Sequence, residues 1–303
     1  MAVITTSNHP KALWPGVKAW WGRSYDEHEE ECSKLFEIEG STRNYEEDVQ
    51  LTGFGLAPQK PQGGSVSYAD ESQGFVSRYT HIPYALGYIV TKEERDDGLY
   101  EIVSKRRAQA LAFSMRQTKE TVAANVYNRA FNGSYAGGDA ASLLNASHPN
   151  TTGGTWSNTL GTAADLSETS LEDMIIQVMG VENDRGHKIS IMPKSLIVPR
   201  QEWFNANRIL NSVLQYDTAN NAANVLKSTN ALPDGIKVNH YLTDADAWFI
   251  RTNAPRGMVG YQRVKPEFTQ DNDFHTDNAL AKCYERYIFY WTDPRGLFGS
   301  PGA

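Results

Sequence analysis

The sequence has few cysteines and no long apolar run. Cys32 and Cys283 are its only two cysteines, and they stand far apart in a chain of 303 residues. Two thiols cannot form a disulfide framework, which favours folding in a reducing compartment. The N-terminus, MAVITTSNHPKALWPG, lacks the basic and then apolar segments of a secretory signal. Because no apolar stretch approaches the roughly 20 residues of a membrane helix, we expect a soluble protein folded in the cell interior.

The charge balance is acidic, with a formal net charge of -7. A dedicated nucleic-acid binder gains its affinity mainly from Lys and Arg that neutralise phosphates. The acidic balance therefore argues against such a binder, although it permits a protein that encloses nucleic acid without gripping it.

Motifs for nucleotide binding and nucleophilic catalysis are absent from the sequence. It contains no GxxxxGK[ST] loop, and Gly53–Gly55 is not followed by the spacing of GxGxxG. It contains no G-x-S-x-G elbow either. Cys283 lies in an alternating strand pattern, where a small buried thiol is the default, although an enzyme that uses Cys283 stays open as a distant alternative. We expect no catalytic residue and no cofactor.

Metal ligands are also sparse. His28 and Cys32 have a spacing that would place two ligands on one helix face, but no second pair has zinc-like spacing. The carboxylate pairs Asp244/Asp246 and Asp271/Asp273 lack a calcium-loop pattern and are typical of turns. We therefore expect no metal site.

One segment, residues 98–132, is strongly helical in character. It lacks proline and interior glycine, and an apolar stripe recurs at spacings of three and four. We predict one nearly continuous helix from about Leu99 to Asn132. At 1.5 Å per residue such a helix spans on the order of 50 Å, which is long for a globular protein.

Before this helix, the flanks Glu46–Phe54 and Phe75–Val90 resemble the two strands of a long hairpin. Their Gly/Pro/Ser-rich centre has too little apolar content for a core, so we expect the hairpin to project and to pair with another molecule. A mobile surface flap is the alternative. Residues 1–40 read as an irregular arm leading into a short helix at about 22–37.

The rest of the chain indicates an α+β fold. A helix is predicted at 165–180, where Ser167 and Ser170 can cap its N-terminus. A strand at 189–198 precedes a second helix that starts after Pro199. From Ile236 onward, short strands alternate with turns.

Several motifs from Ser147 onward resemble the major capsid proteins of tailed bacteriophages, notably the Mu-like major head subunits. The most specific is the closing WTDPRGLFGS, and the others are SHPNTTGGTWSN, DLSETSLEDMI, DRGHKISIMPKSLIVP, RILNS and DADAWFIRT. The resemblance is close over roughly the C-terminal half, and it covers the first half by organisation only.

This resemblance implies the Hong-Kong-type capsid fold, with an N-terminal arm, an extended hairpin called the E-loop, a spine helix in a peripheral domain, and an axial domain. The implied boundaries are 1–45 for the arm and short helix, 46–90 for the E-loop, 91–134 for the spine helix, 135–260 for the axial domain and 261–303 for the returning peripheral strands.

The function implied is that of a subunit that assembles into hexamers and pentamers of an icosahedral head around double-stranded DNA, within the virion. Further implied partners are a portal, a separate scaffolding protein (since the fold is expected to begin near Met1) and decoration proteins. An encapsulin-type nanocompartment subunit is the alternative. The side chains expected to contact a neighbouring subunit are Trp14, Trp20, Trp21, Phe54, Leu56, Phe75 and Tyr79.

Overall fold

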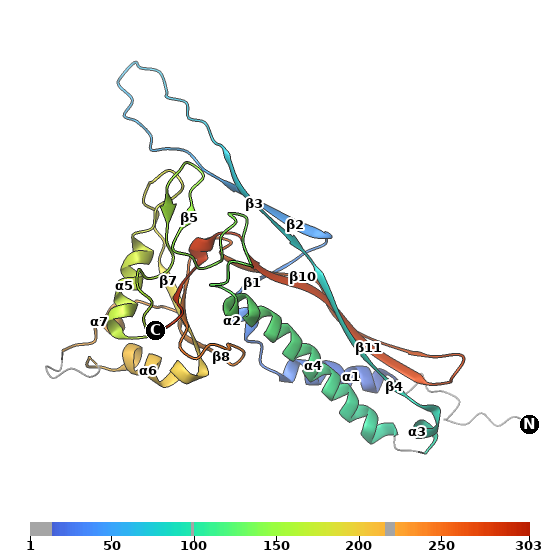
Figure 1. Ribbon diagram of the computed structural model, residues 1–303. Coiled ribbons are helices and arrows are strands. Elements are labelled where there is room, and N and C mark those ends of the chain that lie inside the picture. Colours follow the sequence, from blue (N-terminus) through green and yellow to red (C-terminus); the bar gives the residue numbers. More distant parts are fainter. Residues whose placement is uncertain (1–13, 98–99, 216–221) are drawn as a thin grey trace, which may run out of the picture.

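The computed structural model describes residues 14–97, 100–215 and 222–303, and it consists of two lobes and a projecting hairpin (Figure 1). One lobe is long and narrow, and the other is compact and holds the C-terminus. The hairpin leaves the body near the place where the two lobes meet.

A four-stranded sheet runs along the long lobe in the order β1-β10-β11-β4. Its two central strands are antiparallel, with Met258 opposite Trp291 at one end and Asn272 opposite Ala279 at the other. The short β1 pairs with β10 in parallel, and β4 pairs with β11 in antiparallel fashion. The strands of this sheet are β1 (Glu37–Gly40), β4 (Ile82–Val90), β10 (Met258–Asn272) and β11 (Ala279–Trp291).

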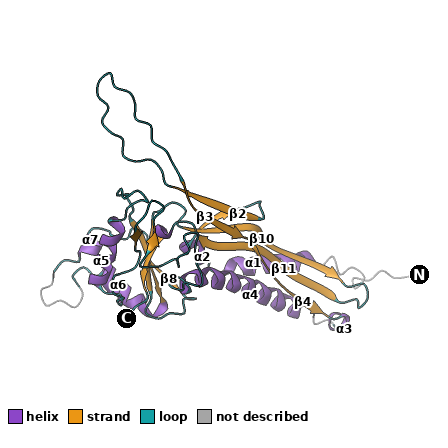
Figure 2. Cartoon of the chain, turned by 45° about the horizontal axis from the view of Figure 1, so that its top comes forward, coloured by secondary structure: helices purple, strands orange, loops and turns teal. Residues whose placement is uncertain are grey.

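The long predicted helix is present as α4 (Tyr100–Asn128), and it lies along one face of this sheet (Figure 2). Leu99 lies outside the described residues, and the helix ends four residues before Asn132, where turns begin. Leu111 and Met115 of the predicted apolar stripe are buried, which fixes the inward face of α4. A short helix, α3 (Lys92–Asp96), precedes it.

The N-terminal helix starts earlier than the sequence pattern predicts. Instead of one helix at 22–37, the structure has α1 (Trp14–Glu27), which packs on α4, and the short α2 (Cys32–Leu35). The acidic segment between them leaves helical form because Glu120 of α4 accepts hydrogen bonds from the backbone N–H groups of Glu31 and Cys32. Residues 1–13 of the expected arm lie outside the described part.

The projecting hairpin is shorter in its second strand than predicted. β2 (Tyr45–Leu51) pairs with β3 (Gln73–Thr80), with Tyr45 opposite Thr80. The predicted strand 75–90 is divided at His81, and its second half is β4, which belongs to the long sheet. His81 is buried, and its ring lies 3.0 Å from the Ser41 hydroxyl; beyond this residue the chain pairs with β11 in place of β2.

The compact lobe is built on a second sheet, in the order β12-β9-β7-β8. Its helix α5 begins as predicted: Ser167 and Ser170 form a reciprocal capping box. The C-terminal strand β12 pairs with β9, which corrects the expectation that all of 261–303 returns to the long lobe. The elements are β5 (His148–Pro149), β6 (Thr155–Trp156), α5 (Glu168–Met179), β7 (Pro193–Pro199), η3 (Arg200–Glu202), α6 (Trp203–Asn211), α7 (Val225–Ser228), β8 (Gly235–Asn239), β9 (Trp248–Thr252), η4 (Pro294–Gly296) and β12 (Leu297–Ser300).

One apolar cluster joins the two lobes. It takes side chains from α2 and α4, from both sheets and from the segment after α4, and its largest buried members are Phe36, Tyr127, Phe249, Tyr287, Phe289 and Trp291. Because close-packed interiors deform little, this shared core fixes the orientation of one lobe against the other.

Candidate assembly surfaces

The root of the hairpin is fastened to the long lobe by a carboxylate. Asp48 of β2 forms an ion pair with Arg256 and accepts a hydrogen bond from the Thr292 hydroxyl at 2.9 Å. Since Thr292 uses its proton there, the Tyr79 hydroxyl, 2.5 Å from the Thr292 oxygen, is the donor between them. Burial and the Asp48 carboxylate raise the pKa of Tyr261 to about 12, so its hydroxyl stays protonated at neutral pH. The contacts of Asp48 therefore hold the root of the hairpin against the long lobe.

The outer part of the hairpin carries apolar side chains that its own subunit leaves uncovered. Phe54 and Leu56 are 63% and 78% exposed on the outgoing segment, and Val66 and Tyr68 are 59% and 94% exposed on the returning one. Residues two apart point to the same side of an extended segment. Each arm of the loop therefore presents a pair of apolar side chains, as interaction surfaces do.

Lower down, the hairpin touches the compact lobe of its own chain. The Gln50 side-chain amide donates to Asp184 at 2.7 Å, and the Arg185 guanidinium donates to the backbone oxygen of Asp70 at 2.8 Å. These contacts hold the base of the loop, and the tip extends past them (Figure 1).

The C-terminal WTDPRGLFGS segment locks the compact lobe to the long one. Arg295 is buried, with its guanidinium 3.0 Å from the Asp184 carboxylate and above the Trp156 ring at 4.6 Å. The Asn158 side-chain amide donates to the backbone oxygens of Pro294 and Leu297 at 3.2 and 3.1 Å. This segment is therefore the structural joint between β11 of the long lobe and β12 of the compact one.

A buried polar group lies beneath α1. Trp21 stacks on Tyr25 and Phe268, with ring centroids 5.2 and 5.7 Å away. Glu285 of β11 is 0% exposed, and neither of its carboxylate oxygens reaches a partner in hydrogen-bond geometry. Burial, the largest influence, raises the pKa of Glu285. A carboxyl in this position is stabilised in its neutral form.

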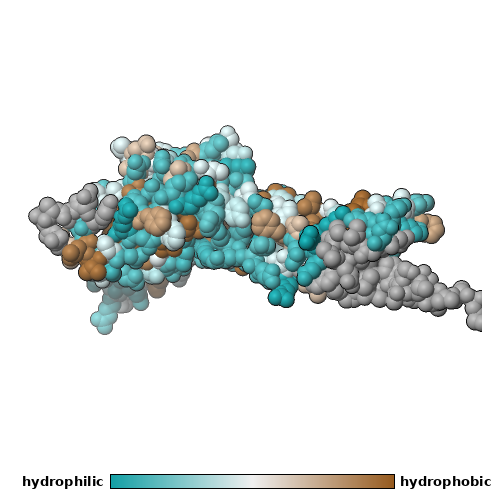
Figure 3. Space-filling model, turned by 90° about the horizontal axis from the view of Figure 1, so that it is seen from below, coloured by the Kyte–Doolittle hydropathy of each residue, from teal (hydrophilic) through white to brown (hydrophobic). Residues whose placement is uncertain are grey.

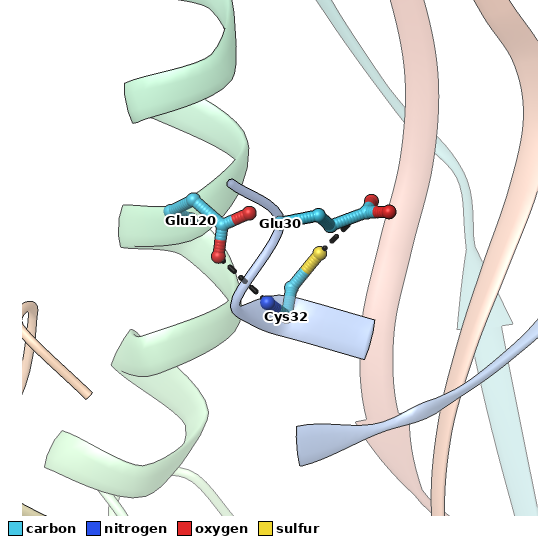
Figure 4. A group of neighbouring side chains, drawn as sticks. All are labelled: Glu30, Cys32 and Glu120. Carbon is cyan, nitrogen blue, oxygen red and sulfur yellow. Dashed lines mark hydrogen bonds between the residues drawn. The ribbon is translucent and has the colours of Figure 1, made fainter. Parts of the chain in front are cut away.

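A second group of side chains has the residue types of a metal site, but its carboxylates already accept hydrogen bonds from the protein. Ligand atoms of Glu30, Cys32 and Glu120 lie within 4.8 Å of one another (Figure 4). Glu120 accepts from the Cys32 backbone N–H at 2.7 Å, and Lys119 donates to Glu30 at 3.1 Å. Burial raises the pKa of the Cys32 thiol, which disfavours the thiolate that a metal needs. His28 packs on the Phe113 ring instead, with centroids 4.7 Å apart. The cluster therefore acts as a hydrogen-bonding group at the N-terminus of α2.

Cys283, the residue considered for catalysis, has a structural role, and so does the buried His148. Cys283 is 0% exposed, and burial raises the pKa of its thiol to about 12, far above that of a working nucleophile. His148 is buried between Asp139 and Asn158, at 2.6 and 3.1 Å, where it ties two loops together.

The residues expected to contact a neighbour fall into three groups. Trp21 and Tyr79 are buried in their own subunit, which corrects their assignment, because the local pattern does not reveal which side chains distant elements of the same chain cover. Phe54 and Leu56 are exposed at the loop, and Phe75 is half-buried at its base. Trp14 and Trp20 belong to α1, but their side chains lie outside the described part of the chain.

A further apolar surface, on the compact lobe, escaped the sequence analysis. Trp203 and Phe204 at the start of α6 are 47% and 66% exposed, and Val213 and Val225 nearby are 73% and 56% exposed. Figure 3 shows apolar surface at this end of the molecule. Two adjacent aromatic residues at a helix start are a usable signal, since a helix cannot bury both neighbours on one stripe.

Several solved structures share this architecture, among them a virus-like particle and a capsid. The chain has a TM-score of 0.53 and 9% identity to a virus-like particle from Pyrococcus furiosus, covering 94% of this chain and 97% of that one. Its TM-score is 0.51 with Microbacterium phage Oxtober96, at 12% identity and 90% coverage of both chains. It is 0.52 with the capsid of a native GTA particle, at 11% identity and 90% coverage of both. The fold is therefore the Hong-Kong-type capsid fold. Among curated proteins, none matches the chain.

The family is shown by the sequence itself. Residues 76–299 match the sequence model of the phage capsid protein family, and the chain belongs to that family. It is a structural subunit of the icosahedral head, located in the virion, and not an enzyme. Among the described helices, none is both long and apolar enough to cross a membrane.

Proposed function

We propose that the chain is the major subunit of the head and forms both hexamers and pentamers, with the hairpin of each subunit lying across a neighbour. One observation carries this proposal: the hairpin root is fixed by the buried Asp48 contacts, whereas its tip leaves large apolar side chains uncovered. Of the side chains that the sequence analysis expects to contact a neighbour, Phe54, Leu56 and Phe75 are the proposed contacts from the hairpin. A rigid base with an uncovered apolar end is suited to binding a second copy.

The proposed division of the chain follows its elements. The arm and short helix occupy 1–45, the E-loop 46–90, the spine helix 91–134, the axial domain 135–260 and the returning peripheral strands 261–303. Three facts adjust these limits: β4 belongs to the long sheet, β10 starts at Met258, and β12 lies in the compact lobe.

More specific parts of the proposal concern subgroup and partners. The motif WTDPRGLFGS supports a place among the Mu-like major head subunits. A separate scaffolding protein, a portal and decoration proteins are the proposed further partners, with assembly in the host bacterial cytoplasm. The acidic charge of -7 suits a container that encloses double-stranded DNA without gripping it.

A nanocompartment shell is the alternative named from the sequence, and the match to a virus-like particle from Pyrococcus furiosus shows that the fold is shared by other shells. The family match over 76–299 favours the phage head.

Electron microscopy of the full chain, expressed alone and purified, tests the proposal. We expect closed polyhedral shells with five-fold and six-fold capsomers. Monomers without shells, tubes or capsomers across a wide range of protein and salt concentrations would contradict it. Nuclease treatment of particles from phage-producing cells separates the candidates: protected double-stranded DNA indicates a head, and DNA-free particles with protein cargo indicate a nanocompartment.

A further inference from the structure

An apolar pocket opens between α4 and the edge of the long sheet. Its volume is about 500 Å³, within the range of ligand pockets, and its apolar wall includes Tyr84, Val122, Val126 and Ile288. The wall comes from α4, β4 and β11, and β4 is the edge strand of its sheet. The lining also includes the exposed polar residues Arg129, Ser134 and Tyr135, which we take as the pocket mouth.

We propose that this pocket receives Tyr68 from the hairpin of a second copy of this chain. The inference rests on the proposed assembly and names the receiving site within it. Tyr68 is 94% exposed, more than the other apolar side chains of the loop. Its ring matches the apolar wall, and its hydroxyl matches the polar mouth, since tyrosine has an apolar body and a polar tip.

The occupant is a second copy because the subunit's own loop points elsewhere. The hairpin leaves the body on the side opposite α4 (Figure 1). Its base is held in that direction by Asp48 and by the contact between Arg185 and Asp70. An intramolecular insertion would require these contacts to break, whereas a neighbour can present the same loop without changing either subunit.

The charges beside Tyr68 match those at the pocket mouth. Asp70 follows two residues later, so in an extended segment its side chain points to the same side as Tyr68. Arg129 is exposed at the mouth, with its guanidinium 4.5 Å from the Tyr135 ring centre. Insertion of Tyr68 therefore places an acidic side chain of the neighbour beside Arg129.

A pair of engineered cysteines tests the contact directly. In the variant Tyr68→Cys/Ser134→Cys, one thiol lies on the loop and the other at the pocket mouth. Both native thiols are buried. After mild oxidation, shells should give a ladder of covalent oligomers on non-reducing gels, and dissociated subunits should stay monomeric. The matched control, Lys60→Cys/Ser134→Cys, places the loop thiol away from the proposed contact and should give no ladder.

Shells that form normally but give no ladder, or give an equal ladder with Lys60→Cys, would overturn the proposal. Absence of shells from the unmodified chain would count against the proposed assembly instead, and micrographs of the same samples separate the two failures.

A charge exchange covers the case in which the cysteine pair blocks assembly. Arg129→Asp and Asp70→Arg should each raise the protein concentration needed for assembly about two- to fivefold, as expected for an exposed ion pair. The double variant should return close to the original value. Additive losses in the double variant would refute the pairing. Tyr68→Ala should raise the same concentration at least about tenfold, as for an interface anchor.

Discussion

Shortening the hairpin should separate folding of the subunit from assembly of the shell. The change replaces Leu56–Ala69 with Asn-Gly, a sequence suited to a tight turn. It keeps Thr52 and Ser72, whose backbone groups join the two arms at 3.1 Å, and it keeps Asp70 for its contact with Arg185. A wider deletion of Pro58–Gly74 would also remove residues of the strand ladder.

The cost to the subunit follows from what the removed residues cover. Leu56 and Tyr68 are 78% and 94% exposed, so their removal uncovers little apolar surface. At about 25 cal/mol per Å² of apolar area, the expected loss in the free energy of unfolding is under about 1 kcal/mol. The shorter loop returns a few tenths of a kcal/mol of closure entropy. The melting temperature should therefore change by about 3 °C or less.

Assembly should respond quite differently. We expect circular dichroism to show a folded, cooperatively melting subunit, and light scattering and electron microscopy to show no shells at concentrations where the original chain assembles. Deleting Gly63–Gly64 alone is the matched control, because it shortens the turn but keeps both apolar pairs, and it should preserve assembly. Loss of the folded state in the longer deletion would show that the segment belongs to the core. Normal shells from it would show that the hairpin is a surface flap.

Three further predictions concern the interior. A carboxyl with a raised pKa holds a proton in the folded state that the unfolded chain releases, so between the ordinary and the raised pKa of Glu285 stability should fall as pH rises. Glu285→Gln should flatten that slope in denaturant titrations and should be more stable, by on the order of 1 kcal/mol, at the alkaline end; an unchanged slope would refute this assignment. Val122→Pro should cost at least about 3 kcal/mol, because it breaks α4 in its interior, and soluble expression should drop; assembly of normal shells from this variant would be the contrary result. Cys283→Ser should leave shell formation intact and lower the free energy of unfolding by about 1 to 3 kcal/mol, because it buries a hydroxyl. Normal shells that had lost an enzymatic activity measurable in the original chain would contradict a purely structural role.

Local chemistry made several elements predictable. The capping box of α5 depends on Ser167 and Ser170, which lie three residues apart. The length of α4 follows from a segment without proline or interior glycine. The exposure of Phe54 and Leu56 follows from neighbours too polar to build a core around them.

Other features depend on contacts between distant residues, which the local pattern does not encode. Residues 73–90 form two consecutive strands with only His81 between them, yet these strands serve two sheets, and the division lies at His81, whose ring is 3.0 Å from the half-buried Ser41 hydroxyl. Tyr79 is buried because Thr292, far along the chain, supplies its partner. The pocket beside α4 needs β4 and β11 together, so the sequence gives no sign of it.

The strand order has a consequence for the time at which a subunit is finished. β11 is a central strand of the long sheet, and β12 completes the compact one, yet both come from the last part of the chain. During synthesis, β4 and α4 emerge long before the strand that they pack against. Pairing over such sequence separations is slow because loop closure precedes the gain in contacts. A chain from which β11 and β12 have not yet emerged therefore lacks both complete sheets, and it does not present the whole surface that a growing particle adds to itself.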